Sequence, residues 1–251
     1  MLLTYTKLQP YHSNRYLYKV FFYLKIAFLL INVTFLPCYN YFMSRYIAIT
    51  DIHGELRKLD SVLSKVNTRD DDIFVFMGDY IDRGPDSRGV VDRIISKNTT
   101  NKCIYLIGSH EYAYLHSKQD EYYNYLFWNY GGPETVKSYG SFENIGKIHG
   151  EFFKSLNFYY LTDKYLFVHA GINPKYPINE QDEVDMVYIR YNFINSKHNL
   201  PQKIIFGHTD FNRPYIDEGK IGIDLGCGKY KNSPLCALIL DNGREEFVYS
   251  D

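Results

Sequence analysis

Residues 73–84 read IFVFMGDYIDRG, an apolar run of five residues that passes directly into a polar loop. A short apolar run that ends at a glycine is typical of a buried strand, and the polar heptapeptide after it is typical of a loop. Strand ends are where an open α/β sheet collects its ligand-binding side chains. This stretch therefore predicts a layered α/β domain in which Asp79, Asp82 and Arg83 share one loop.

Four other short apolar runs end in the same way. They are Tyr46–Thr50 before DIHG (51–54), Cys103–Ile107 before GSHE (108–111), Tyr165–Val168 before HAG (169–171) and Lys203–Phe206 before GHT (207–209). Helix-like spacing of apolar residues follows DIHG and GDYIDRG, from Leu56 and from about Asp86, as an α/β fold requires. Near the end of the chain, Leu235–Leu240 turns through an Asn-Gly pair into Glu246–Tyr249, which predicts a β-hairpin.

Composition and charge limit the class of protein. The chain has 251 residues, 45% of them hydrophobic, which is enough for one well-packed domain. Its formal net charge is −1, so no nucleic-acid partner is expected. The four cysteines form no CxxC pair, which argues against a disulfide framework or a thiolate zinc site and favours a reducing, cytoplasmic location.

The first 42 residues differ in character from the rest. Basic residues flank an apolar run, Ile26–Leu36, that is shorter than the roughly 18 residues a membrane-spanning helix requires. No small-residue cleavage site follows it. Three interpretations stay open: translation upstream of a true start at Met43, a membrane anchor, or a secretion signal. We take residues 43–251 as the folded domain and expect a membrane partner only if residues 1–42 are a real anchor.

The five strand ends carry side chains that suit a metal centre. Carboxylates and imidazoles without thiolates favour a divalent cation such as manganese, iron or zinc. Two ions about 3.5 to 4 Å apart, sharing one carboxylate, can activate a water and hold both oxygens of an in-line phosphoryl displacement. Asp79 is the natural shared ligand because its loop lies between the first and third strand ends. The proposed ligands are Asp51, His53, Asp79, His169 and His208.

The remaining motif residues fit the other requirements of phosphoester cleavage. His110 can supply a proton to the leaving oxygen, and Asp82 can orient its ring. Arg83 can grip two phosphate oxygens with its planar fork, and Arg190 is a second candidate for that role. The histidines outside such turns are read as structural: His12, His116, His149 and His198.

The ordered set DIHG, GDYIDRG, GSHE, HAG and GHT resembles the phosphoprotein phosphatase branch of the calcineurin-like metallophosphoesterases, particularly its bacterial and phage serine/threonine phosphatases. The resemblance implies a four-layer α/β/β/α sandwich with two mixed sheets and two divalent metal ions, with manganese expected in vitro. It also implies attack on phosphorus by a metal-bound hydroxide and a phosphorylated protein or peptide as substrate. By the same resemblance, Asp79 bridges the first metal (Asp51, His53) and the second (His169, His208), His110 and Asp82 form the acid pair, and Arg83 and Arg190 bind phosphate.

One position departs from the family pattern. Where the motif is GNHE, this chain has Ser109, so a hydroxyl stands where an asparagine amide oxygen binds the second metal. We expect weaker binding of that ion. Two alternatives to a protein phosphatase stay open: a dinucleoside polyphosphate hydrolase, whose relatives share the GDxxDRG set, and a pseudophosphatase that binds phosphorylated partners.

Overall fold

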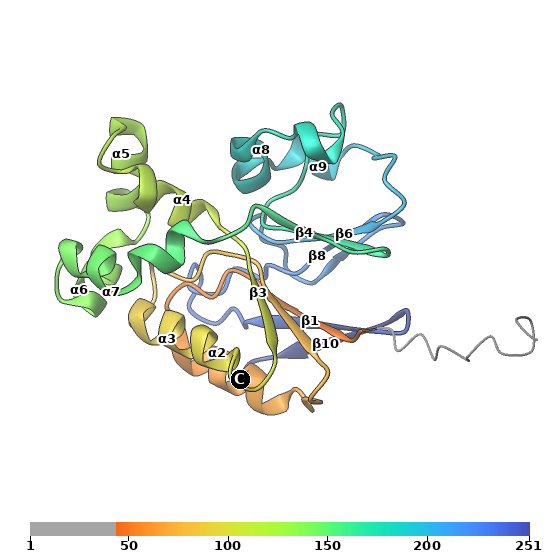
Figure 1. The fold of residues 1–251 in the computed structure, drawn as a ribbon, viewed down its shortest axis with the longest axis horizontal. Coiled ribbons are helices and arrows are strands. Elements are labelled where there is room, and N and C mark those ends of the chain that lie inside the picture. The colour runs from red at the N-terminus through yellow and green to blue at the C-terminus, as the bar shows by residue number, and fades with distance from the viewer. Residues whose placement is uncertain (1–43) are drawn as a thin grey trace, which may run out of the picture. The chain divides into compact units, whose positions relative to one another are not determined.

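The structure is a computed structural model that describes residues 44–251 (Figure 1). The three interpretations of residues 1–42 lie outside the described residues. Within residues 44–251 the chain forms one compact unit. No helix in this part of the chain is both long enough and apolar enough to cross a membrane.

The first sheet contains the strands that deliver three of the five motifs. Its order is β10-β9-β1-β2-β3, with β1 (Tyr46–Ile49), β2 (Ile73–Phe76), β3 (Lys102–Tyr105), β9 (Cys236–Asp241) and β10 (Arg244–Tyr249). Strands β1, β2 and β3 are parallel, and β9 pairs antiparallel with β1 and with β10. The hairpin expected at the Asn-Gly pair is confirmed, and the predicted strands differ from the observed ones only at their ends.

The second sheet delivers the other two motifs. Its order is β4-β5-β6-β8-β7, with β4 (Tyr159–Leu161), β5 (Tyr165–Val168), β6 (Lys203–Phe206), β7 (Tyr215–Ile216) and β8 (Lys220–Gly222). The parallel strands β5 and β6 have the predicted bounds. The sequence pattern missed β4, β7 and β8 because each has only two or three residues and no apolar alternation.

Helices cover the outer face of each sheet, which completes the four predicted layers (Figure 1). A core that includes Ala48, Val75, Phe167 and Ile205 lies between the two sheets. The described helices are α2 (Leu56–Lys65), α3 (Ser87–Lys97), α4 (Ser109–His116), α5 (Glu121–Asn129), α6 (Gly132–Tyr139), α7 (Phe142–Lys154), α8 (Glu183–Tyr188) and α9 (Tyr191–Ile194), with a 3-10 turn at Ile178–Glu180. Helices α2 and α3 lie below the first sheet in this view, α8 and α9 above the second, and α4 to α7 beside the sandwich.

Local sequence explains where the helices beside the motifs begin. The Asp86 side chain accepts a hydrogen bond from the Gly89 backbone nitrogen at 2.8 Å, so α3 starts directly after the GDYIDRG loop. Helix α4 starts at Ser109, inside the GSHE motif rather than after it. The third motif is therefore a helix N-terminus and not a free turn.

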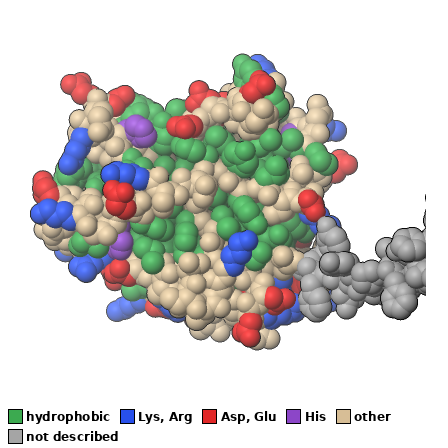
Figure 2. Space-filling view, viewed as in Figure 1, with side chains coloured by type: hydrophobic (Ala, Val, Ile, Leu, Met, Phe, Trp, Pro, Cys, Tyr) green, Lys and Arg blue, Asp and Glu red, His purple; other side chains and the backbone are tan. Residues whose placement is uncertain are grey.

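The surface carries both hydrophobic and charged side chains. On the face shown in Figure 2, hydrophobic side chains gather across the middle and charged side chains lie mostly around the rim. Much of the aromatic content packs inside, for example Phe74, Phe76 and Phe167, which are fully buried. Among the described cysteines, Cys103, Cys227 and Cys236 are free thiols.

Candidate active site

The site loops share an unusual backbone conformation. Six non-glycine residues here have a positive φ: Asp51 (51°), His53 (49°), Asp79 (52°), Asp82 (74°), Arg83 (67°) and His208 (61°). This left-handed region is unfavourable for residues with a Cβ, and such strain is concentrated at functional sites. Hydrogen bonds between loops hold it in place, from the Asp51 backbone nitrogen to the Gly78 oxygen (3.1 Å) and from the His53 nitrogen to the Asp79 oxygen (2.9 Å).

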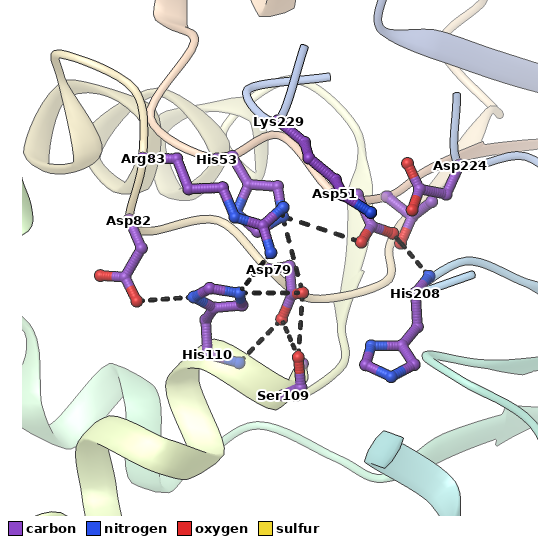
Figure 3. A network of polar contacts seen from close by, with 12 residues as sticks. Asp51, His53, Asp79, Asp82, Arg83, Ser109, His110, His208, Asp224 and Lys229 are labelled. Carbon is purple, nitrogen blue, oxygen red and sulfur yellow. Dashed lines mark hydrogen bonds and ion pairs between the residues drawn. The ribbon is translucent and has the colours of Figure 1, made fainter. Parts of the chain in front are cut away.

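The Asp79 carboxylate lies at the centre of the cluster (Figure 3). Its Oδ2 is 3.4 Å from His169 Nε2, 3.7 Å from His53 Nε2 and 3.9 Å from His110 Nε2. Its Oδ1 accepts a hydrogen bond from the His110 backbone nitrogen at 2.9 Å. The predicted shared ligand is thus the group on which three motif histidines from both sheets converge.

Hydrogen bonds fix which ring nitrogen of each histidine faces the centre. Nδ1 of His53 lies 3.0 Å from the Ile81 oxygen, and Nδ1 of His169 lies 2.8 Å from the Met77 oxygen. Because a carbonyl oxygen can only accept, both Nδ1 atoms carry hydrogen, and Nε2 is the nitrogen of each ring that faces Asp79 and could bind a metal. This arrangement is the usual one for a metal-binding imidazole.

The donor set fits divalent metal ions. Two groups of buried ligand atoms could each hold an ion, one of His53, Asp79 and His110 and one of Asp79, His169 and His208. The Nε2 atoms of His169 and His208 are buried without a hydrogen-bond partner, which is costly unless a ligand completes them. Asp51 joins the two sheets at this point, because its Oδ2 accepts from the His208 backbone nitrogen at 3.0 Å.

The ionisation of these groups also suits a cation. Burial, with Arg83 and His110 nearby, holds the pKa of His53 well below its usual value, and burial with His169 does the same for His208. Burial alone would raise the pKa of Asp79, but His169 and His110 hold it well below its usual range. Burial opposes protonation of His169, yet Asp79 raises its pKa to about 9. A bound cation would replace that proton.

His110 and Asp82 form a buried pair. His110 Nδ1 lies 2.6 Å from Asp82 Oδ2. Thr135 anchors the carboxylate from the other side, since its hydroxyl donates to Asp82 Oδ1 at 2.6 Å and accepts from the Asp82 backbone nitrogen at 2.8 Å. Burial opposes the charged imidazole, but Asp79 and Asp82 outweigh it and raise the pKa of His110. The ring is oriented and readily protonated.

The two arginines occupy different places. Arg83 donates from Nη1 to His53 Nε2 at 2.8 Å and from Nη2 to His110 Nε2 at 3.0 Å, so its fork lies inside the cluster. Arg190 is exposed and donates to the His208 backbone oxygen at 2.8 Å. Both contact residues of the cluster, and their phosphate-binding roles stay predictions.

Ser109 lies in the cluster, and its hydroxyl faces the Asp79 carboxylate. Its hydroxyl is 3.1 Å from Asp79 Oδ2 and donates to it. Because a hydroxyl has one hydrogen and a short reach, Ser109 acts here as a partner of the shared ligand. Direct metal ligation by Ser109 stays a prediction.

Two positioning residues were missed by the sequence reasoning. Glu111 is fully buried and accepts from the backbone nitrogens of Asp79 (2.8 Å), Tyr80 (2.8 Å), Ile81 (3.2 Å) and Gly108 (3.1 Å). Its place in GSHE was the available signal. Thr135 carried none, since a threonine far along the chain from Asp82 has no distinguishing pattern.

The fold and the cluster define a metal-dependent phosphoesterase. The profile of the calcineurin-like phosphoesterase family matches residues 44–248. The chain belongs to this family, whose members bind a dinuclear divalent metal site.

Individual relatives carry different names. Bis(5'-nucleosyl)-tetraphosphatase PrpE (asymmetrical) of Oceanobacillus iheyensis is 25% identical over 213 residues, covering 71% of this chain and 82% of that protein. The protein of the same name from Anoxybacillus flavithermus is 27% identical over 217 residues, covering 72% and 85%. A protein serine/threonine phosphatase from Saccharomyces cerevisiae shares the fold, with a TM-score of 0.62 and 16% identity, covering 85% of this chain and 82% of that one.

Proposed function

We propose that this protein is a dinucleoside tetraphosphatase that cleaves its substrate asymmetrically at a two-metal centre. The observation that carries the metal-dependent step is the convergence of three histidine Nε2 atoms within 3.9 Å of Asp79 Oδ2. The substrate class is supported by the two tetraphosphatase relatives, which this chain matches over more than four-fifths of their length.

The proposed reaction gives each group of site residues a different role. Asp51, His53, Asp79, His169 and His208 would hold two divalent ions, which when bound supply an activated water and neutralise charge on the phosphoryl group. His110 would bring a proton to the leaving oxygen, while Asp82 fixes its ring through Nδ1. Arg83 and Arg190 would contact the non-bridging phosphate oxygens.

A serine/threonine protein phosphatase is the second candidate. The His110–Asp82 pair favours it, because a serine or threonine alkoxide leaves far less readily than a nucleoside polyphosphate and needs the proton more. The motif set resembles that branch of the family as well.

One assay compares the candidates. The full chain is incubated with diadenosine tetraphosphate, a phosphothreonine peptide and p-nitrophenyl phosphate across a manganese titration, beside Asp79→Asn as the inactive control. Metal-dependent release of AMP and ATP, faster than peptide dephosphorylation, supports the proposal. Preferential turnover of the peptide would replace it with the second candidate. No turnover of any substrate by a folded, metal-binding chain would favour the pseudophosphatase alternative.

A further inference from the structure

A cavity of about 470 Å³ adjoins the candidate active site. Arg83 belongs to both, because its guanidinium contacts His53 and His110 while the residue also lines the cavity. Cavities of this size accommodate drug-sized molecules. A substrate with one phosphoryl group at the metal centre can therefore extend its remainder into this space.

Both walls of the cavity are fixed against active-site residues. On one wall, the Gly131 oxygen accepts a hydrogen bond from the Arg83 backbone nitrogen at 3.2 Å, and a Cβ at Gly131 would collide with Arg83. On the other wall, a Cβ at Gly228 would collide with His53. The cavity is thus held in a set position relative to the reacting centre.

Aromatic side chains supply the apolar surface of the cavity. Trp128 stacks on Phe142, with ring centroids 5.8 Å apart and planes 24° apart, and 41% of the residue is exposed. Tyr130 also lines the cavity and is 52% exposed. Exposed aromatic faces beside a charged groove are the usual platform on which nucleobases stack.

The charged side chains complement more than one phosphoryl group. Arg83 and Lys229 line the cavity against a single carboxylate among its described lining residues, that of Glu134. Lys229 is held in place by Asp210, 2.6 Å from its ammonium, and Figure 3 draws it on the same side of the cluster as Arg83. A phosphopeptide brings one phosphate to the site, whereas a polyphosphate chain brings further charge that a second cation can bind.

We propose that this Trp128 cavity binds the nucleoside end of a nucleotide substrate, with the base against Trp128 and Tyr130 and the adjoining phosphates between Arg83 and Lys229. The inference rests on the proposed function and adds the residues that select the substrate. Glu134 offers an acceptor for an exocyclic amino group of the base.

Trp128 is the only tryptophan in the chain, so its fluorescence reports directly on the cavity. The full chain without added metal is titrated with adenosine 5'-monophosphate and, separately, with ribose 5-phosphate. Saturable quenching by the nucleotide alone is the expected result, because a stacked purine quenches indole emission and a sugar phosphate cannot stack. An equal response to both, no response to either, or quenching by a phosphothreonine peptide in place of the nucleotide would overturn the proposal.

Variants connect this binding to turnover. Tyr130→Ala keeps the Trp128 reporter and should weaken nucleotide quenching about fivefold or more, the lower bound for a lost stacking partner. Tyr130→Ala and Trp128→Leu should each raise KM for diadenosine tetraphosphate about fivefold or more beyond any change for p-nitrophenyl phosphate. Tyr122→Ala, on the same helix as Trp128 but outside the cavity, is the matched control and should change neither the quenching nor KM.

The two hypotheses fail separately. If diadenosine tetraphosphate is hydrolysed but the cavity variants behave like Tyr122→Ala, the Trp128 cavity is not the nucleoside site. If the nucleotide quenches Trp128 but diadenosine tetraphosphate is not hydrolysed, the proposed function is wrong and the binding site stands.

Discussion

Replacing Thr135 with valine tests whether the anchoring of Asp82 supports both stability and catalysis. The change keeps the side chain's shape but removes the hydroxyl that donates to Asp82 Oδ1 at 2.6 Å, in a fully buried position. A hydrogen bond to a charged group contributes roughly 1.5 to 3 kcal/mol, so we expect a loss of about 2 kcal/mol. In a domain of this size that lowers Tm by roughly 4 to 8 °C.

The same substitution should slow turnover. Asp82 would still contact His110 but would be free to rotate away from it, and losing a supporting partner of this kind typically costs about tenfold in activity. Thermal denaturation and manganese-dependent hydrolysis of p-nitrophenyl phosphate measure the two effects. Thr135→Ser, which keeps the hydroxyl, is the matched control. If the valine variant equals the serine variant in both Tm and kcat, the reasoning about Asp82 is refuted.

Three further outcomes are expected. Glu111→Gln should lower Tm by at least 5 °C, roughly the effect of two unpaired backbone N–H groups, while the exposed Glu151→Gln should not; equal values would contradict this. Ser109→Asn should raise activity at limiting manganese, and an unchanged titration curve would count against a weakened second site. Burial holds the pKa of His149 below its usual value, so unfolded chains bind its proton more readily and stability is lost as pH falls below about 6.5. The Tm advantage over His149→Gln should therefore shrink from pH 8 to pH 5.5; a constant difference would exclude this.

Strands were predictable where an apolar run leads directly into a polar motif. β5 and β6 were located because each is an apolar run that ends in a histidine-containing turn. β8 was missed because it has only three residues, and its first residue, Lys220, gives no sign in the sequence that it is buried. In the structure its ammonium is buried, donating to the backbone oxygens of Phe193 (3.2 Å), Ile194 (2.7 Å) and Ser196 (2.7 Å). Local composition cannot show a lysine satisfied by distant carbonyls.

The candidate site was likewise only partly predictable from the sequence. The convergence of the five proposed ligands was predictable because parallel strands deliver their loops to one edge, and the structure does bring Asp51, His53, Asp79, His169 and His208 together, while their binding of metal stays a prediction. Sequence patterns did not predict the residue that positions Asp82. Thr135 reaches Asp82 from far along the chain, through helix packing, and no spacing rule connects it to the motifs.

The convergence of ligands from two sheets has a consequence for folding. His169 and His208 follow strands of the second sheet, whereas Asp79 follows a strand of the first, so the group of Asp79, His169 and His208 is complete only when the two sheets are docked. An ion held by ligands from both sheets would favour the docked sandwich by mass action, and would act as a cross-link that none of the described cysteines supplies. Resistance to proteolysis should accordingly rise with metal concentration.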